Sequence, residues 1–85
     1  MSADIDTSRM KRPINEMPED VREALSKAKL TGAYRERPPY QQNDYLGWIG
    51  RAKLPATRAK RLQQMLDELA DGTLYMKMSY RPARP

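Results

Sequence analysis

Eighty-five residues limit the chain to one small domain with a modest hydrophobic core. Sixteen Lys and Arg against eleven Asp and Glu give a formal charge of +5, which is compatible with binding to nucleic acid or to an anionic membrane surface. The absence of Cys and His excludes disulfides and argues against a zinc site. Because no apolar run is long enough to span a membrane and the first residues lack a signal-peptide core, we expect a cytoplasmic protein without a transmembrane segment.

Composition divides the chain into three segments. Residues 1–16 are polar and mixed in charge, and we expect a disordered or loosely docked N-terminal lead. Residues 17–72 show helical apolar periodicity, which predicts an all-α fold, a small bundle of three main helices with a short connector turn. Residues 73–85 are predicted to be an extended C-terminal segment that ends in a basic, proline-rich tail.

The first helix is predicted within the stretch MPEDVREALSKAKL. Pro18 suits the first helical position, and Glu19 and Asp20 place negative charge at the positive end of the helix dipole. Gly32 is the predicted stop. The expected buried face follows the i, i+3, i+4, i+7 pattern and consists of Val21, Ala24, Leu25 and Ala28.

A connector with one helical turn around residues 33–37 leads to the second helix, predicted from Tyr40 to Ala52. Pro38 and Pro39 prevent a helix from running through them, so the connector and the second helix are separate. The expected apolar face of the second helix consists of Tyr45, Trp48, Ile49 and Ala52, with Leu46 at the edge. Gly47 and Gly50 fall on the opposite face, which we expect to face solvent; they are either neutral there or form a bare patch for a partner.

The third helix is predicted to run from Pro55 to Asp71, with Gly72 as its stop. Its apolar stripe consists of Leu62, Met65, Leu66 and Leu69, with Ala59 alongside. After it, the stretch TLYMKMSY alternates apolar and polar residues in the pattern of a β-strand. We expect the alternating set to lie across the helices or to pair with a second molecule, giving a partner segment of Leu74, Met76, Met78 and Tyr80.

Catalysis has few candidate residues in this sequence. General acid–base chemistry usually recruits His or a carboxylate in a pocket, and the chain has no His and a small core. The helix-spaced acid pairs, Asp20 with Glu23 and Asp67 with Asp71, are read as solvated surface acids and not as a metal site. No phosphate-binding loop or nucleophile motif is present, so we expect no enzyme, no metal and no cofactor.

The stretch RAKLPATRAKRL places five cations in twelve residues, between Asp44 and Asp67. On a helical wheel Arg58 falls inside the apolar stripe of the third helix, which favours a structural lock over a ligand contact. Asp44 is the proposed member of this lock, with Glu19 and Asp20 as further candidates for the partner carboxylate. The cations left for an external anion or a partner are Arg51, Lys53, Lys60 and Arg61.

Two stretches, MPEDVREAL and YLGWIGRAKLPATRAKRLQQMLDELADG, resemble the YdeI/OmpD-associated family, also called the bacteriocin-protection family. The resemblance covers about residues 17–72. The positions that carry it are Pro18, Asp20, Ala24, Leu25, Trp48, Ile49, Ala52, Lys53, Thr57, Arg58, Arg61 and Leu62. It implies an all-helical, non-catalytic module linked to resistance against antimicrobial peptides and to an outer-membrane porin partner, with no active site to transfer.

The predicted function is therefore a protein-interaction module of the bacterial envelope stress or bacteriocin response, with an unknown protein partner and a possible homodimer through the C-terminal segment. The alternative is a small basic nucleic-acid-binding domain, because two helices joined by a short turn with cations at the second helix resemble a helix-turn-helix. A third hypothesis is a regulator or enzyme subunit whose chemistry lies on another chain.

Overall fold

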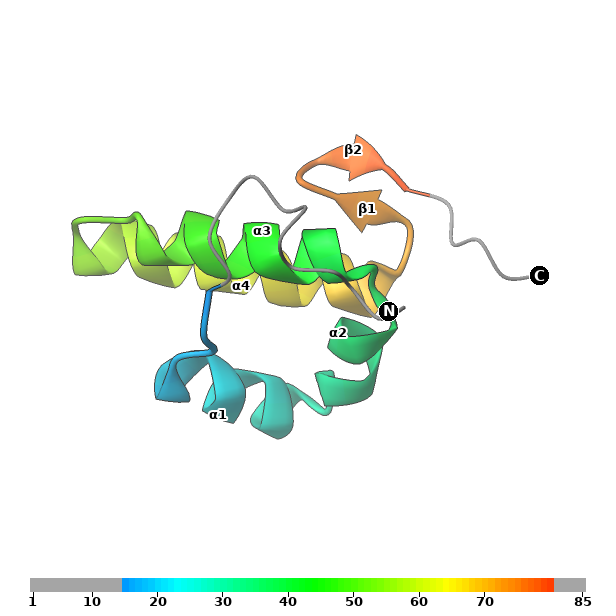
Figure 1. Ribbon diagram of the computed structural model, residues 1–85, viewed down its shortest axis with the longest axis horizontal. Helices are drawn as coiled ribbons and strands as arrows, with labels where there is room; N and C mark the ends of the chain where they lie inside the picture. Colours follow the sequence, from blue (N-terminus) through cyan, green and yellow to red (C-terminus); the bar gives the residue numbers. More distant parts are fainter. Residues whose placement is uncertain (1–14, 81–85) are drawn as a thin grey trace, which may run out of the picture.

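The computed structural model describes residues 15–80 (Figure 1). Nearly all of the predicted N-terminal lead and the whole of the tail 81–85 lie outside these residues. In chain order the elements are α1 (Glu19–Ala28), α2 (Thr31–Glu36), α3 (Pro39–Gly50), α4 (Pro55–Asp71), β1 (Leu74–Tyr75) and β2 (Met78–Ser79). The all-α prediction is confirmed in part: residues 15–80 are mostly helical, but they form four helices and an antiparallel strand pair in place of three main helices and one extended segment.

Helices α3 and α4 lie side by side, and α1 and α2 pack against one side of this pair (Figure 1). Each of these four helices contributes to one core: α1, α3 and α4 through apolar residues at helical spacing, and α2 through Tyr34. The buried apolar residues are Val21, Leu25, Tyr34, Tyr45, Leu46, Ile49, Met65 and Leu69. Between residues 15 and 80, no helix is both long enough and apolar enough to cross a membrane.

Helix α1 ends earlier than predicted, at Ala28. The following residue, Lys29, adopts the left-handed conformation at φ 60°, and its N–H donates to the carbonyl of Ser26 at 3.1 Å. Leu30 N–H donates to the carbonyl of Leu25 at 2.9 Å, which completes a Schellman-type end with Lys29 in the position that normally favours Gly. The prediction that Gly32 is the stop was wrong, since that residue lies inside α2.

Gly47 is buried, so the prediction that it faces solvent was wrong. A Cβ atom at this position would lie 2.9 Å from the side-chain amide of Asn15, which crosses α3 at this point. Asn15 is held there by Asn43, whose Oδ1 accepts from the Asn15 backbone N–H at 2.7 Å and whose carbonyl accepts from its side chain at 3.2 Å. Gly50, in contrast, is exposed as predicted, with open space around it.

The C-terminal segment turns back on itself as an antiparallel hairpin, and does not form the single strand that its alternation predicted. The register pairs Leu74 with Ser79 and Tyr75 with Met78, which leaves a two-residue turn at Met76 and Lys77. Both turn residues have positive φ, 52° and 65°, as a type I′ turn requires. Sequence patterns did not predict this turn, because type I′ turns normally carry Asn and Gly and not Met and Lys.

Candidate functional site

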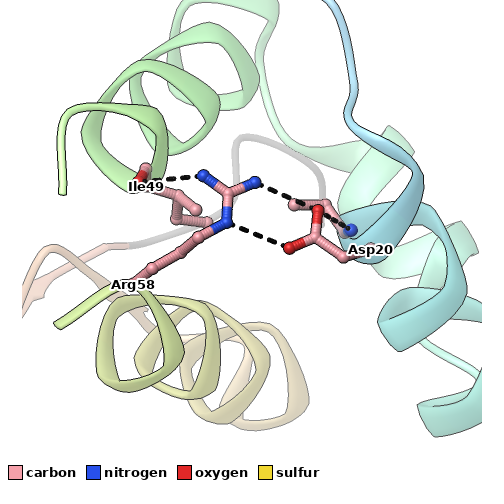
Figure 2. Close-up of polar contacts among 4 residues, drawn as sticks. Asp20, Ile49 and Arg58 are labelled. Carbon is pink, nitrogen blue, oxygen red and sulfur yellow. Dashed lines mark hydrogen bonds and ion pairs between the residues drawn. The ribbon is translucent and has the colours of Figure 1, made fainter. Parts of the chain in front are cut away.

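Arg58 joins the start of α4 to both α1 and α3. Figure 2 shows its guanidinium between the carboxylate of Asp20 and the carbonyl of Ile49. Nε and Nη2 each donate to one oxygen of Asp20 at 3.0 Å, and Nη1 donates to the Ile49 carbonyl at 3.4 Å. A planar guanidinium that bonds both carboxylate oxygens fixes orientation as well as distance, so Arg58 positions α1 on the α3–α4 pair.

This ion pair shifts the ionisation of both partners. The hydrogen bonds from Arg58 lower the pKa of Asp20 below its ordinary value, and Asp20 raises the pKa of Arg58. The side chains are 30% and 51% exposed for Arg58 and Asp20 respectively. Because solvent screens a pair this exposed, we assign it only about 0.5–1 kcal/mol of stability.

Asp44 was the predicted carboxylate partner of Arg58, but the structure gives Arg58 the carboxylate of Asp20. The Oδ2 of Asp44 accepts a hydrogen bond from the hydroxyl of Tyr75 at 2.6 Å, so Asp44 ties α3 to the hairpin. The Tyr75 ring packs edge-on against Tyr45 and Tyr40, with centroids 5.5 and 6.2 Å away. The proposed association of Arg58 with Asp44 is therefore corrected to Asp20, which the sequence also offered as a candidate.

The four cations named as candidates for anion binding fall into two groups. Arg61 is half-buried: its Nη1 donates to the carbonyl of Trp48 at 2.7 Å, and its guanidinium carbon lies 5.4 Å from the centroid of that indole ring. Arg51, Lys53 and Lys60 are exposed, and no hydrogen bond or ion pair within residues 15–80 engages their side chains. These three therefore remain available to an external anion, while Arg61 braces the end of α3.

An exposed apolar residue sits among these cations, and sequence reasoning missed it. Leu54 lies directly before Pro55 in the turn between α3 and α4, and it is 65% exposed. The signal in the sequence was its position, because it belongs to neither helical stripe. We call the exposed set Arg51, Lys53, Leu54 and Lys60 the α3–α4 corner.

At the other end of α4, the carboxylate of Glu68 is buried and holds the hairpin turn. One oxygen accepts from the hydroxyl of Tyr45 at 2.5 Å and from the N–H of Met76 at 2.8 Å. The other accepts from the N–H of Lys77 at 2.8 Å and from the side-chain amide of Gln64 at 3.1 Å. Four hydrogen bonds thus satisfy a buried charge and fix the two residues that have positive φ.

Arg37 is the buried cation beside this network, and sequence reasoning missed both residues. Its guanidinium donates to the backbone carbonyl of Glu68 at 3.0 Å and to the side chain of Gln41 at 3.1 Å. Its guanidinium carbon also lies 4.7 Å from the centroid of the Tyr80 ring, a cation–π contact. Arg37 therefore connects the start of α3, the end of α4 and the chain after β2.

Two tyrosines in the core have shifted ionisation. Burial raises the pKa of Tyr45 above its ordinary value, and its hydrogen bond to Glu68 raises it further. Burial alone raises the pKa of Tyr34 to about 12, and its hydroxyl donates to the carbonyl of Gln42 at 3.4 Å. Both hydroxyls therefore stay protonated at neutral pH.

The residues of the predicted partner segment do not share one face. Met76 packs partly buried against the core, and Tyr80 lies half-buried under Arg37. Leu74 and Met78 are exposed, by 36% and 58%. The hairpin thus divides the four candidate residues into two that anchor it and two that remain on the surface.

One member of each acid pair that was considered as a metal site makes a structural contact. Asp20 pairs with Arg58, and Asp71 accepts from the backbone N–H of Thr73 at 2.9 Å and from its hydroxyl. Residues 15–80 contain no group of three or more carboxylates that could hold a metal ion.

Comparison with known proteins identifies the module that carries these features. The family model described as bacteriocin-protection, YdeI or OmpD-associated matches residues 15–72, which include α1 to α4 and stop before the hairpin. No curated protein and no solved structure matched the chain significantly. Since the match spans most of the sequence, this chain belongs to the bacteriocin-protection, YdeI or OmpD-associated family.

Proposed function

We propose that this protein is a non-catalytic module that binds a protein partner in the response that the family name indicates, bacteriocin protection or association with an envelope protein. The chain provides no His or Cys for chemistry. Its buried carboxylate, Glu68, accepts four hydrogen bonds that hold the fold together. These observations favour binding over catalysis.

The observation that carries the proposal is the exposure of two apolar side chains on the hairpin, Met78 on the same face as Tyr75 and Leu74 on the opposite face. Met78 and Leu74 present apolar side chains to solvent on a hairpin that Glu68 and Arg37 hold in place. Exposed apolar groups on a fixed element are typical of a binding surface, because little conformational entropy is lost when a partner covers them.

The backbone of β2 supplies the second half of such a surface. Tyr80 N–H donates to the carbonyl of Thr73 at 2.7 Å, and Tyr75 pairs with Met78, so these are the hydrogen-bonded positions of the ladder. The intervening residue, Ser79, then directs its N–H and carbonyl away from β1. An extended segment of a protein partner fits this edge by adding a strand beside β2.

A photo-reactive amino acid in place of Met78 tests the proposal in the native cell, with the exposed α1 residue Ser26 as the control position. We expect a discrete cross-linked partner from position 78 and none from position 26.

The substitution Met78→Asp is the second test. It should abolish capture of this partner, and it should fail to restore bacteriocin protection to a strain that lacks the gene. A cross-link to a second copy of this chain, matched by a dimer in solution, would replace the heterologous partner with self-association. Unchanged capture and protection in Met78→Asp would overturn the proposal.

The nucleic-acid-binding alternative has less support. Two of the five cations in the stretch 51–62, Arg58 and Arg61, make their hydrogen bonds within the protein. The family name points to bacteriocins and an envelope protein. A steep loss of DNA affinity with rising salt would be the result that favours it.

A further inference from the structure

The α3–α4 corner combines free positive charge with exposed apolar surface. Its cations Arg51, Lys53 and Lys60 are exposed, and the sequence has no acidic residue between Asp44 and Asp67. Leu54 has the highest exposure, 65%, of the large apolar side chains between residues 15 and 80. An exposed apolar side chain in a turn that also carries exposed cations matches the chemistry of a phospholipid surface, which presents anionic headgroups above hydrocarbon.

The position of the corner in the fold makes it accessible to a flat surface. Figure 1 shows the turn between α3 and α4 at one end of the helix pair, beyond α1 and at the opposite end of α4 from the hairpin. Leu54 has extended backbone angles, φ −104° and ψ 141°, and it precedes the first residue of α4. The turn is therefore a projecting tip, a shape suited to a membrane surface.

Intramolecular arginines support this tip. Arg58 donates to the carbonyl of Ile49, and Arg61 donates to the carbonyl of Trp48, so both cap carbonyl groups at the C-terminal end of α3. The negative end of a helix dipole disfavours an approaching anion, and these two cations offset it. Because Arg58 and Arg61 already bond these carbonyls, the exposed cations of the corner remain free for an external ligand.

We propose that the α3–α4 corner binds anionic phospholipid surfaces, with Leu54 entering the headgroup region and Arg51, Lys53 and Lys60 contacting lipid phosphates. Nucleic acid fits less well. A phosphate backbone requires only the cations, and Trp48 in the last turn of α3 is half-buried with Arg61 over it, so it offers no open face for a base. This binding is independent of the hairpin surface, which lies at the other end of α4.

Flotation of the full chain with vesicles tests the proposal. One set contains phosphatidylglycerol mixed equally with phosphatidylcholine, and the other contains phosphatidylcholine alone. We expect binding to the anionic vesicles only. Lys53→Gln/Lys60→Gln should weaken it by about 25-fold, at about fivefold per cation. Its matched control is Lys27→Gln/Lys29→Gln, which removes the same charge from the end of α1 and should change binding by less than about twofold.

The apolar contact has its own matched pair. Leu54→Ser should weaken vesicle binding by about tenfold, whereas Met78→Ser, at a similarly exposed apolar residue of the hairpin, should leave it unchanged. All of these positions are exposed or lie in turns, so circular dichroism should report unchanged helix content. Four outcomes overturn the proposal: no binding to anionic vesicles, equal loss in the controls, an unaffected Leu54→Ser, or tight DNA binding without vesicle binding.

Discussion

The two ends of α4 use charged residues in opposite ways. At its C-terminal end Glu68 and Arg37 are buried, and hydrogen bonds engage both of them. At its N-terminal end Arg58 is partly exposed and pairs across the surface, while Lys53 and Lys60 are exposed. A buried charge must be satisfied by a defined structure, whereas an exposed charge tolerates change and remains available to a ligand. The first end therefore specifies the fold, and the second leaves a surface for binding.

The strongest test of this contrast is Glu68→Gln. The amide preserves the side-chain shape, but its NH2 group must face one of the N–H donors of Met76 and Lys77. We expect a loss of about 2–3 kcal/mol in the free energy of unfolding, because a buried donor loses its acceptor. Urea denaturation measures the loss, and hydrogen exchange should show reduced protection in residues 73–80.

The matched control for this substitution is Glu23→Gln, at an exposed position of α1. It should change the free energy of unfolding by less than about 0.5 kcal/mol. Equal effects of the two substitutions would contradict the assignment of Glu68 as the residue that fixes the hairpin.

Alkaline pH should act on the core and the hairpin end. Burial and Glu68 raise the pKa of Tyr45, and burial raises the pKa of Tyr34 to about 12. Since both folded-state values lie above the unfolded value of about 10, the stability they contribute is complete below pH ~10 and is lost as pH rises above it.

The substitution Tyr45→Phe separates the contribution of Tyr45 to this pH dependence from that of Tyr34. It should lower stability by about 1–2 kcal/mol at neutral pH, because Glu68 loses one hydrogen bond, and it should reduce the loss between about pH 10 and pH 12. Urea denaturation across this pH range provides the measurement. A variant with the slope of the wild type would contradict the role given to Tyr45.

Acid pH should lower stability at the N-terminal end of α4, where Arg58 pairs with Asp20. The pKa of Asp20 is lowered by Arg58, so this pair contributes stability above the ordinary Asp value of about 4 that is lost as pH falls through the lowered value. Arg58→Gln should therefore cost about 0.5–1 kcal/mol at pH 7 and less in acid.

A double-mutant cycle of Arg58→Gln with Asp20→Asn isolates the coupling between the two side chains. The exposed pair of Arg22 with Glu19, 2.9 Å apart, is the control and should show a smaller coupling. Zero coupling for Arg58 and Asp20 at pH 7 would show that their hydrogen bonds add nothing to stability.

Two further small effects test the backbone conformation of the hairpin turn. Lys77 is exposed at φ 65°, so Lys77→Gly should stabilise the protein by about 0.5 kcal/mol, whereas Lys77→Thr should destabilise it by about 1 kcal/mol. Thermal unfolding of the two variants provides the measurement. A stabilising Thr would show that the backbone conformation at this position carries no strain.

Sequence patterns predicted those elements whose ends have standard signals. Helix α4 was predicted with its observed bounds, because Pro55 begins it and Gly72 ends it. The end of helix α1 and the hairpin turn differ from the prediction, because Lys29, Met76 and Lys77 occupy backbone conformations that Gly or Asn usually take. At Met76 and Lys77 the hydrogen bonds to Glu68 compensate for this conformation, and at Lys29 the local bonds at the end of α1 do so, and neither effect can be read from the residue type.

The site was predicted in part for a similar reason. The helical wheel placed Arg58 toward the other helices, and the structure gives it Asp20, one of three proposed partners. Periodicity cannot rank such partners, because the choice depends on how α1 crosses the α3–α4 pair. Glu68 escaped notice because its acceptor role appears only after the chain turns back beyond Gly72.

The bonds of Glu68 also bear on how this chain and its relatives diverge. Glu68 lies within the family-matched residues 15–72, but the N–H groups of Met76 and Lys77 that it accepts from lie beyond them. In a relative without the hairpin, an acid at this position would keep only the bonds from Tyr45 and Gln64 and would be exposed to water. Its role in fixing a turn would then be lost, so we expect acidic residues at this position chiefly in relatives that carry the extension.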